Sequence, residues 1–240
     1  MSDTFEAGTP AHHIAVGVCT ALIVSTFFAA RRANNFEGKK LRLIIGWGCV
    51  AVWIANTVLL MRPDRFHWSG SLPPHFCNLA NLLGAIAVLQ QKRLFQGILY
   101  FWALGLCIWA FITPTLGEGP ALIGYWIFWA YHLFIGLAVA FFLGADRFRP
   151  TWSDLTNASL FTLGYLAVLF ALNLITGWNY GFVGPSTPSS PTPVDALGPY
   201  PWRVLWMALL GAAIFTALWL PWHLAKGGTD SSKQIEQRRK

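Results

Sequence analysis

The feature that most constrains the fold of this chain is a set of seven apolar runs. Each run is near the length that a helix needs to cross a membrane. They cover residues 14–30, 43–61, 73–90, 94–113, 120–144, 155–175 and 204–224. About 20 residues span the roughly 30 Å of bilayer hydrocarbon as a helix. The pattern predicts an all-α, polytopic membrane helix bundle with seven transmembrane helices.

The polar residues leave no room for a separate soluble domain. Only 11% of the residues are charged, against roughly 25% in soluble domains. We therefore expect residues 1–225 to form a single transmembrane helical domain. Residues 226–240 are expected to form a polar, basic and flexible cytoplasmic tail.

The basic residues between the runs predict the orientation. Of the 17 Lys and Arg, 14 follow the first, third, fifth and seventh runs, and the other 3 are Arg62, Arg65 and Arg203. Because cytoplasmic loops carry the excess of Lys and Arg, the N-terminus is expected outside and the C-terminus inside. Residues 1–13 contain no Lys or Arg, so they lack the basic region of a secretory signal and we expect them to be retained.

Two of the connections between the apolar runs have sequences that predict a local feature. The outside loop, residues 178–202, is rich in Pro, Ser and Thr, and a loop of this length is either functional or mobile. At the inside turn before the sixth run, Ser153 or Asp154 is expected to cap the helix by accepting from its free N–H groups.

Cysteine usage and net charge exclude several classes of protein. The 4 cysteines lie inside apolar runs and give no disulfide framework. No CxxC or HxxxH pair suggests a metal, and no cofactor is implied. The net charge of +7 is divided among short loops and the tail, which membrane topology explains better than binding to nucleic acid does.

The third run opens with ionisable and polar groups at membrane depth, where such groups are costly and mark functional sites. Cys77 is a candidate nucleophile, because a thiolate attacks ester carbonyls. Packing as a small hydrophobe is the alternative, and we prefer it for the cysteines at 19, 49 and 107. His75 points away from Cys77 on a regular helix, unless the Pro73-Pro74 start distorts the first turn.

Two carboxamides accompany this thiol. Asn81 lies four residues after Cys77 on the same helical face, where it would orient a base or donate to an oxyanion. The alternative is that Asn78 and Asn81 form hydrogen bonds between helices.

His132 is the candidate base, although a buried histidine also serves simply as a hydrogen-bond donor to a neighbouring helix. Counted from the basic residues that mark the inside surface, Cys77 and His132 both lie about 22 Å deep, and Asn56 lies about 21 Å deep. Counted from the outer ends of the runs, Cys77 and His132 differ in depth by about 12 Å. The pairing of Cys77 with His132 is therefore a hypothesis.

Several short motifs resemble a known family when taken in order. They are residues 75–77, 113–116, His132, 149–152, 179–180 and 197–202. Across residues 72–220 the chain resembles the bacterial YwaF-type integral membrane proteins. These are similar to a eukaryotic group of transmembrane acyltransferases that move fatty acyl chains between phospholipids. The resemblance implies a multi-pass protein of the bacterial inner (plasma) membrane, with Cys77 and His132 at the matching catalytic positions.

Three functions remain open at this stage. The leading hypothesis is a lipid acyl-ester transferase or hydrolase that acts on membrane lipid through Cys77 and His132, supported by His75, Asn81 and Asn56. The second is a non-catalytic structural or assembly subunit with protein partners in a larger membrane complex. A small-molecule transporter is the weakest, because the chain shows no inverted repeat and no intramembrane carboxylate.

Overall fold

The computed structural model describes residues 3–69, 71–72, 75–185 and 193–238, with only the backbone for 226–238. The elements in chain order are α1 (Pro10–Arg32), α2 (Asn35–Leu60), α3 (Phe76–Leu89), α4 (Arg93–Trp102), the π-helical turn η1 (Ala103–Cys107), α5 (Trp109–Ile112), α6 (Ile123–Gly144), α7 (Trp152–Thr176), the 3₁₀ turns η2 (Tyr180–Phe182) and η3 (Pro193–Leu197), and α8 (Trp202–Arg238). The prediction of an all-helical fold is confirmed for these residues.

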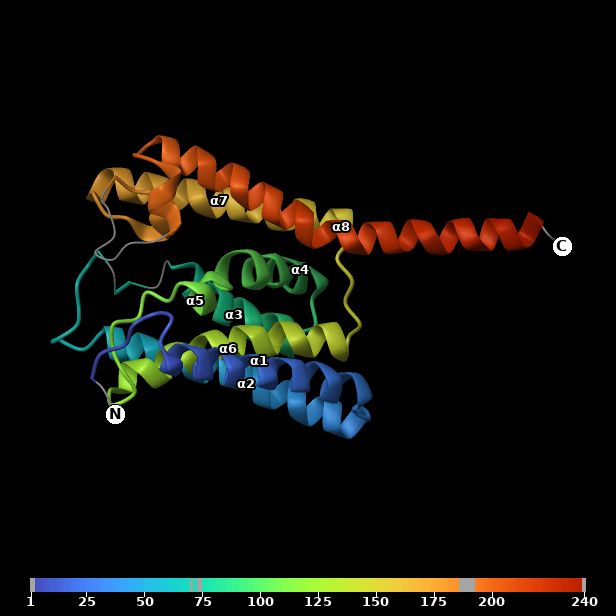
Figure 1. Cartoon of the computed structure of the whole chain (residues 1–240), viewed down its shortest axis with the longest axis horizontal. Coiled ribbons are helices and arrows are strands. Elements are labelled where there is room, and N and C mark those ends of the chain that lie inside the picture. The colour runs from blue at the N-terminus through green and yellow to red at the C-terminus, as the bar shows by residue number, and fades with distance from the viewer. Residues whose placement is uncertain (1–2, 70, 73–74, 186–192, 239–240) are drawn as a thin grey trace.

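The helices run up and down between two ends of one bundle (Figure 1). We call the end that holds the start of α1 the N-side and the end that holds the turn between α1 and α2 the C-side. The connections before α3, after α5 and after α7 lie on the N-side, and those before α2, α4 and α7 lie on the C-side. The N-side corresponds to the outside of the sequence prediction, which stays a prediction because no membrane is present.

Among the described residues, six segments are long and apolar enough to cross a membrane, so the prediction of a multi-pass membrane protein is confirmed. They are Pro10–Arg32, Asn35–Leu60, Arg93–Ile112, Ile123–Gly144, Trp152–Thr176 and Trp202–Ala225. The expected third span is the exception, because α3 has 14 residues and is only about 21 Å long. The structure therefore supports six candidate spans and one shorter apolar helix.

The short helix α3 lies at the centre of the packing. It contacts α2, α4, η1 and α6, while α6 also packs on α1 and α2. The core beside it holds large side chains with at most 1% of their surface exposed, namely Trp102, Phe101, Phe141, Phe142, Ile98 and Leu99. The first turn of α3 is thus surrounded by other helices, and this position defines the candidate site.

One close approach depends on a glycine. A Cβ added to Gly144 in α6 would lie 2.5 Å from the backbone oxygen of Phe27 in α1. Small residues at such crossings allow two helix backbones to approach closely. The packing of α1 on α6 therefore requires glycine at this position.

On the C-side, the carboxylate of Asp154 in α7 forms hydrogen bonds that join the start of α7 to the start of α4. Asp154 accepts from the backbone N–H of Thr151 at 2.7 Å, and Thr151 Oγ1 accepts from the backbone N–H of Asp154 at 3.4 Å. Arg93 at the start of α4 donates to both oxygens of Asp154, at 3.1 and 2.6 Å. The prediction of Ser153 or Asp154 as the helix cap is wrong: the N-cap residue is Thr151, and Asp154 is the third helical residue, which completes a capping box by accepting from the backbone N–H of Thr151. Ser153 is already inside the helix, which begins at Trp152.

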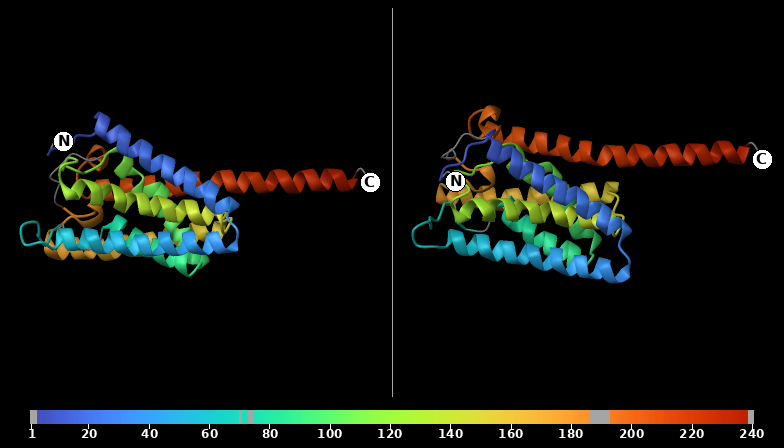
Figure 2. Two further views of the ribbon diagram at one scale, coloured as in Figure 1. Left: turned by 90° about the horizontal axis from the view of Figure 1, so that it is seen from below. Right: turned by 60° about the horizontal axis from the view of Figure 1, so that its bottom comes forward.

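The helix α8 extends past the rest of the bundle on the C-side (Figure 2). Its backbone is helical through Arg238, whereas a flexible tail is expected from the sequence of residues 226–240. Only Trp202–Ala225 is apolar enough to span a membrane. The domain boundary near residue 225 stays a prediction.

Candidate functional site

Cys77 lies in the first turn of α3 and differs from the other cysteines in exposure. All four cysteines are free, and Cys19, Cys49 and Cys107 are buried while Cys77 is partly exposed. Taken as a whole residue, Cys77 is therefore the least buried of the four cysteines.

The structure brings the predicted pair together. The Cys77 thiol interacts electrostatically with the thiol of Cys107 and the imidazole of His132, and more weakly with the imidazole of His75. Cys107 ends the π-helical turn η1, and such turns are frequent at functional sites. Sequence reasoning treated Cys107 as a packing residue, because a π turn has no sequence pattern that would reveal it.

Hydrogen bonding selects one tautomer of His132. The Nδ1 atom lies 2.8 Å from the backbone carbonyl oxygen of Phe128. A carbonyl can only accept, so Nδ1 carries the hydrogen and Nε2 of the neutral ring carries the lone pair. The ring is only 6% exposed and packs against Phe128 at 4.4 Å between centroids. His132 therefore offers one basic nitrogen in a mostly apolar setting.

The amide of Asn81 braces α3 against α6. Its Nδ2 donates to the carbonyl of Tyr131 at 3.1 Å and to that of Cys77 at 3.4 Å. Both amide hydrogens are thereby used, while the buried Oδ1 has no partner among the described residues. The contacts match the alternative of hydrogen bonds between helices, and they leave no Asn81 donor for an oxyanion.

A second carboxamide pair joins α2 to α3. Asn56 Nδ2 donates to Asn78 Oδ1 at 3.2 Å, and the hydroxyl of Tyr131 donates to the same oxygen. Asn78 and Tyr131 are 4% exposed. Three helices thus meet at the carbonyl of Asn78, one residue after Cys77.

The start of α3 is covered by residues 177–184, which we call the cap. The ring of Tyr180 lies 4.9 Å from the ring of His75 and has 0% of its surface exposed. Its hydroxyl donates to the carbonyl of Trp68 at 2.6 Å and accepts from the N–H of Leu72 at 3.1 Å. Burial raises the pKa of the Tyr180 phenol above its ordinary value, so the group keeps its proton at neutral pH.

The side chain of Asn173 forms two of the hydrogen bonds that join the cap to α7. Asn173 Nδ2 donates to the carbonyl of Tyr180 at 2.8 Å, and Asn173 Oδ1 accepts from the N–H of Tyr180 at 2.9 Å. Gly181 has φ +66°, and a Cβ there would lie 2.8 Å from Leu169 and 3.4 Å from Phe76. This part of the loop between α7 and α8 therefore forms an ordered cover over the first turn of α3.

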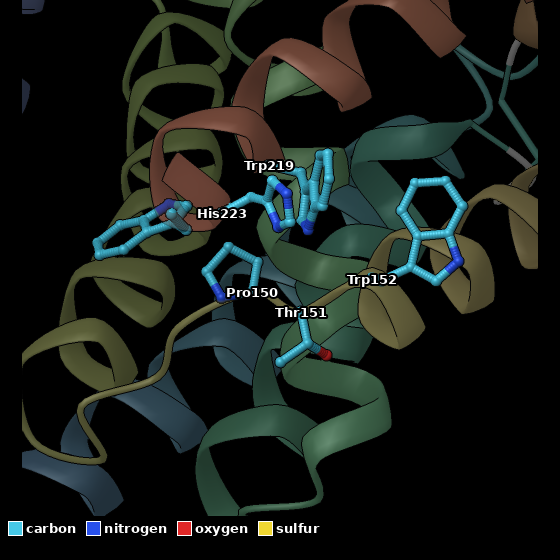
Figure 3. Close-up of a pocket in the computed structure, with 6 residues that line it drawn as sticks. Pro150, Thr151, Trp152, Trp219 and His223 are labelled. Atoms are coloured by element: carbon cyan, nitrogen blue, oxygen red, sulfur yellow. The ribbon is translucent and has the colours of Figure 1, made fainter. Parts of the chain in front are cut away.

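A separate pocket of about 210 Å³ lies at the C-side. Figure 3 shows Trp219 and His223 of α8 next to Pro150 and Thr151. The rings of Trp219 and His223 are stacked at 4.6 Å between centroids. The pocket contains no thiol or carboxylate, and indole rings are common where a helix meets the membrane surface. We therefore place the candidate chemistry at Cys77.

The described cysteine, histidine and acidic residues form no group of three or more that could hold a metal ion. The cavity that a lipid substrate requires beside Cys77 stays a prediction.

The fold and this polar cluster define a multi-pass helical membrane protein with a thiol and an imidazole enclosed among its helices. The chain belongs to the TMEM164 family, whose model matches residues 7–219. It is also similar to an uncharacterized protein of Treponema pallidum (strain Nichols), with 28% identity over 120 residues. That alignment covers 50% of each protein, so the chain spans about half the length of this relative.

No solved structure matches the chain. The family match supports a distant relation to a eukaryotic membrane family, as the sequence resemblance implies. The more specific resemblance to YwaF-type proteins stays a prediction.

Proposed function

We propose that this protein transfers or hydrolyses fatty acyl esters of membrane lipids, with Cys77 as nucleophile and His132 as general base. The observation that carries the proposal is the electrostatic interaction of the Cys77 thiol with His132, whose Nδ1 is held by the carbonyl of Phe128. A nucleophile within reach of a base, which is itself oriented by a third group, is the usual arrangement for covalent catalysis. Here the carbonyl of Phe128 is that third group.

The proposed reaction has two steps. The thiol proton moves to His132 Nε2 as the Cys77 sulfur bonds to the ester carbonyl carbon, whose π electrons move to the oxygen. When this intermediate collapses, the C–O bond to the lipid breaks, and the leaving lysolipid oxygen takes the proton from His132. A hydroxyl of a second lipid, or water, then attacks the thioester carbon and gives its proton to His132 Nε2. The C–S bond breaks, and the leaving sulfur of Cys77 takes that proton, which restores the thiol.

The test uses the purified full chain in lipid nanodiscs that contain a phospholipid with one labelled acyl chain and an unlabelled lysolipid. We expect labelled acyl transfer to the lysolipid and a labelled thioester on the peptide that contains Cys77. Cys77→Ala and His132→Ala should both abolish transfer, since groups that act as a unit lose activity to a similar degree.

Cys49→Ala is the matched control, because Cys49 is fully buried in α2 and should keep transfer activity. Full activity in Cys77→Ala, or no acyl transfer and no ester hydrolysis by the wild-type chain, would refute the proposal.

The inferred location is the bacterial inner membrane with the N-side outside. The supporting observation is the excess of Lys and Arg in the C-side connections. Accessibility tags at the two chain ends provide the test, because one tag should label from each side of the membrane. Labelling of both ends from one side would contradict this orientation.

A second candidate function is that of a subunit in a larger membrane complex. It is favoured by the extension of α8 beyond the bundle and by the exposure of Leu205, Trp206 and Leu209 on that helix. Removal of residues 226–240 should then weaken association with partner proteins while the bundle remains folded. A full-length chain that purifies only as a monomer would argue against this function.

A further inference from the structure

Attack of a thiol on an ester creates a negative oxygen, and neither Cys77 nor His132 can stabilise it. Enzymes of this kind place hydrogen-bond donors where that oxygen forms. Three carboxamides lie near Cys77, at positions 56, 78 and 81, and their hydrogen bonds distinguish them.

Helical spacing from Cys77 favours Asn81 as the oxyanion donor, but this side chain has no unused amide hydrogen. Both of its amide hydrogens go to backbone carbonyls, those of Cys77 and Tyr131. Asn56 lies on α2 and directs its amide at the oxygen of Asn78. These two side chains therefore hold the helices together.

Asn78 has the opposite arrangement. Its carbonyl oxygen accepts from Asn56 and from the hydroxyl of Tyr131, and both contacts fix the plane of the amide. Nδ2 of Asn78 donates to no protein group among the described residues. This nitrogen is also not one of the fully buried polar atoms that lack a hydrogen-bond partner. Two N–H donors are consequently held in place without being used.

The position of Asn78 relates this amide to the proposed pair. Asn78 follows Cys77 directly in α3, and Tyr131 precedes His132 directly in α6. The hydroxyl of Tyr131, which holds the oxygen of Asn78, also interacts electrostatically with the Cys77 thiol. One hydrogen bond, from Tyr131 to Asn78, thus links the two residues next to the nucleophile and the base.

We propose that Asn78 is a catalytic residue whose Nδ2 donates to the oxyanion formed when Cys77 attacks a lipid ester. This inference rests on the proposed acyl-transfer function. Asn56 and Tyr131 act as positioning residues, because they orient the amide through its oxygen.

The test compares two reagents on the same thiol in detergent-solubilised full-length protein. A p-nitrophenyl fatty acid ester acylates Cys77 through an oxyanion, while iodoacetamide alkylates it by direct displacement without one. The ratio of the two rate constants removes effects on the amount of thiolate. Asn78→Ala should lower this ratio about 100- to 1000-fold, the usual effect of losing one oxyanion donor.

Asn78→Asp supplies a second variant, because its carboxylate can still accept from Asn56 and Tyr131 but lacks the amide donors. It should lower the ratio to a similar degree even if Asn78→Ala folds poorly. Asn81→Ala is the matched control from the same helix, and its ratio should stay within about threefold of wild type, since that amide is already committed to backbone carbonyls.

An unchanged ratio in Asn78→Ala or Asn78→Asp overturns the inference and leaves the Cys77–His132 proposal intact. An equal fall in Asn81→Ala also overturns it, because the effect would then be general loss of packing. A wild-type thiol that reacts with iodoacetamide but never with the ester refutes the proposed function itself.

Discussion

Replacement of Asn173 by Ala tests how strongly this side chain anchors the cap to α7. The substitution removes two hydrogen bonds, at 2.8 and 2.9 Å, to the backbone of the fully buried Tyr180. A side-chain hydrogen bond within a membrane protein contributes about 0.6 kcal/mol on average, and a bond in a soluble protein up to about 1.5 kcal/mol. The two bonds together predict a loss of about 1.2 to 3 kcal/mol in the free energy of unfolding.

The assay is denaturant titration of the purified protein in mixed micelles, with helix content as the signal. Asn157→Ala on the same helix is the matched control, because Asn157 is exposed and forms no side-chain hydrogen bond among the described residues. Its unfolding free energy should stay within about 0.5 kcal/mol of wild type. Equal effects of the two substitutions, or no effect of Asn173→Ala, would refute the reasoning about the anchor.

Three further predictions follow from single contacts. Gly144→Ala should destabilise the fold by about 1–3 kcal/mol through overpacking, whereas Gly164→Ala, with nothing within 4 Å of the new Cβ, should be neutral or stabilising in the same titration. Asp154→Ala should cost about 1–2 kcal/mol, because it removes the carboxylate that completes the helix capping box and accepts from Arg93; an unchanged unfolding curve would contradict this. Native-state maleimide labelling should modify Cys77 first and be lost in Cys77→Ala, and mass spectrometry that finds another cysteine modified at the same rate would exclude Cys77 as the accessible thiol.

The helices were predictable because each depends on a property of a single segment. An apolar run of membrane-spanning length folds as a helix wherever it packs, since the bilayer leaves its backbone no other hydrogen-bond partner. The start of α7 was placed three residues late, at residue 155 and not at Trp152. The polar residues of its first turn are part of the helix, with Asp154 completing the cap.

The roles within the site were less predictable, because they depend on contacts between segments. Helical spacing correctly puts Asn81 near Cys77, but it cannot show that the carbonyl of Tyr131 on α6 occupies the amide. The sequence of η1 contains no pattern that predicts a π turn, so from sequence alone Cys107 is predicted only to pack as a small hydrophobe. Tyr180 entered only through a motif resemblance, since its partners Trp68 and Leu72 are more than 100 residues away.

The shortness of α3 has a consequence for how a lipid would reach Cys77. A helix of about 21 Å leaves about 9 Å of a 30 Å hydrocarbon layer uncrossed on the N-side. Other helices surround α3, and the cap residue Tyr180 lies against His75 at its start, so protein and not lipid occupies this depth. A lipid ester would therefore have to enter between the helices to reach Cys77, and a thinner bilayer alone should not raise the rate of acyl transfer.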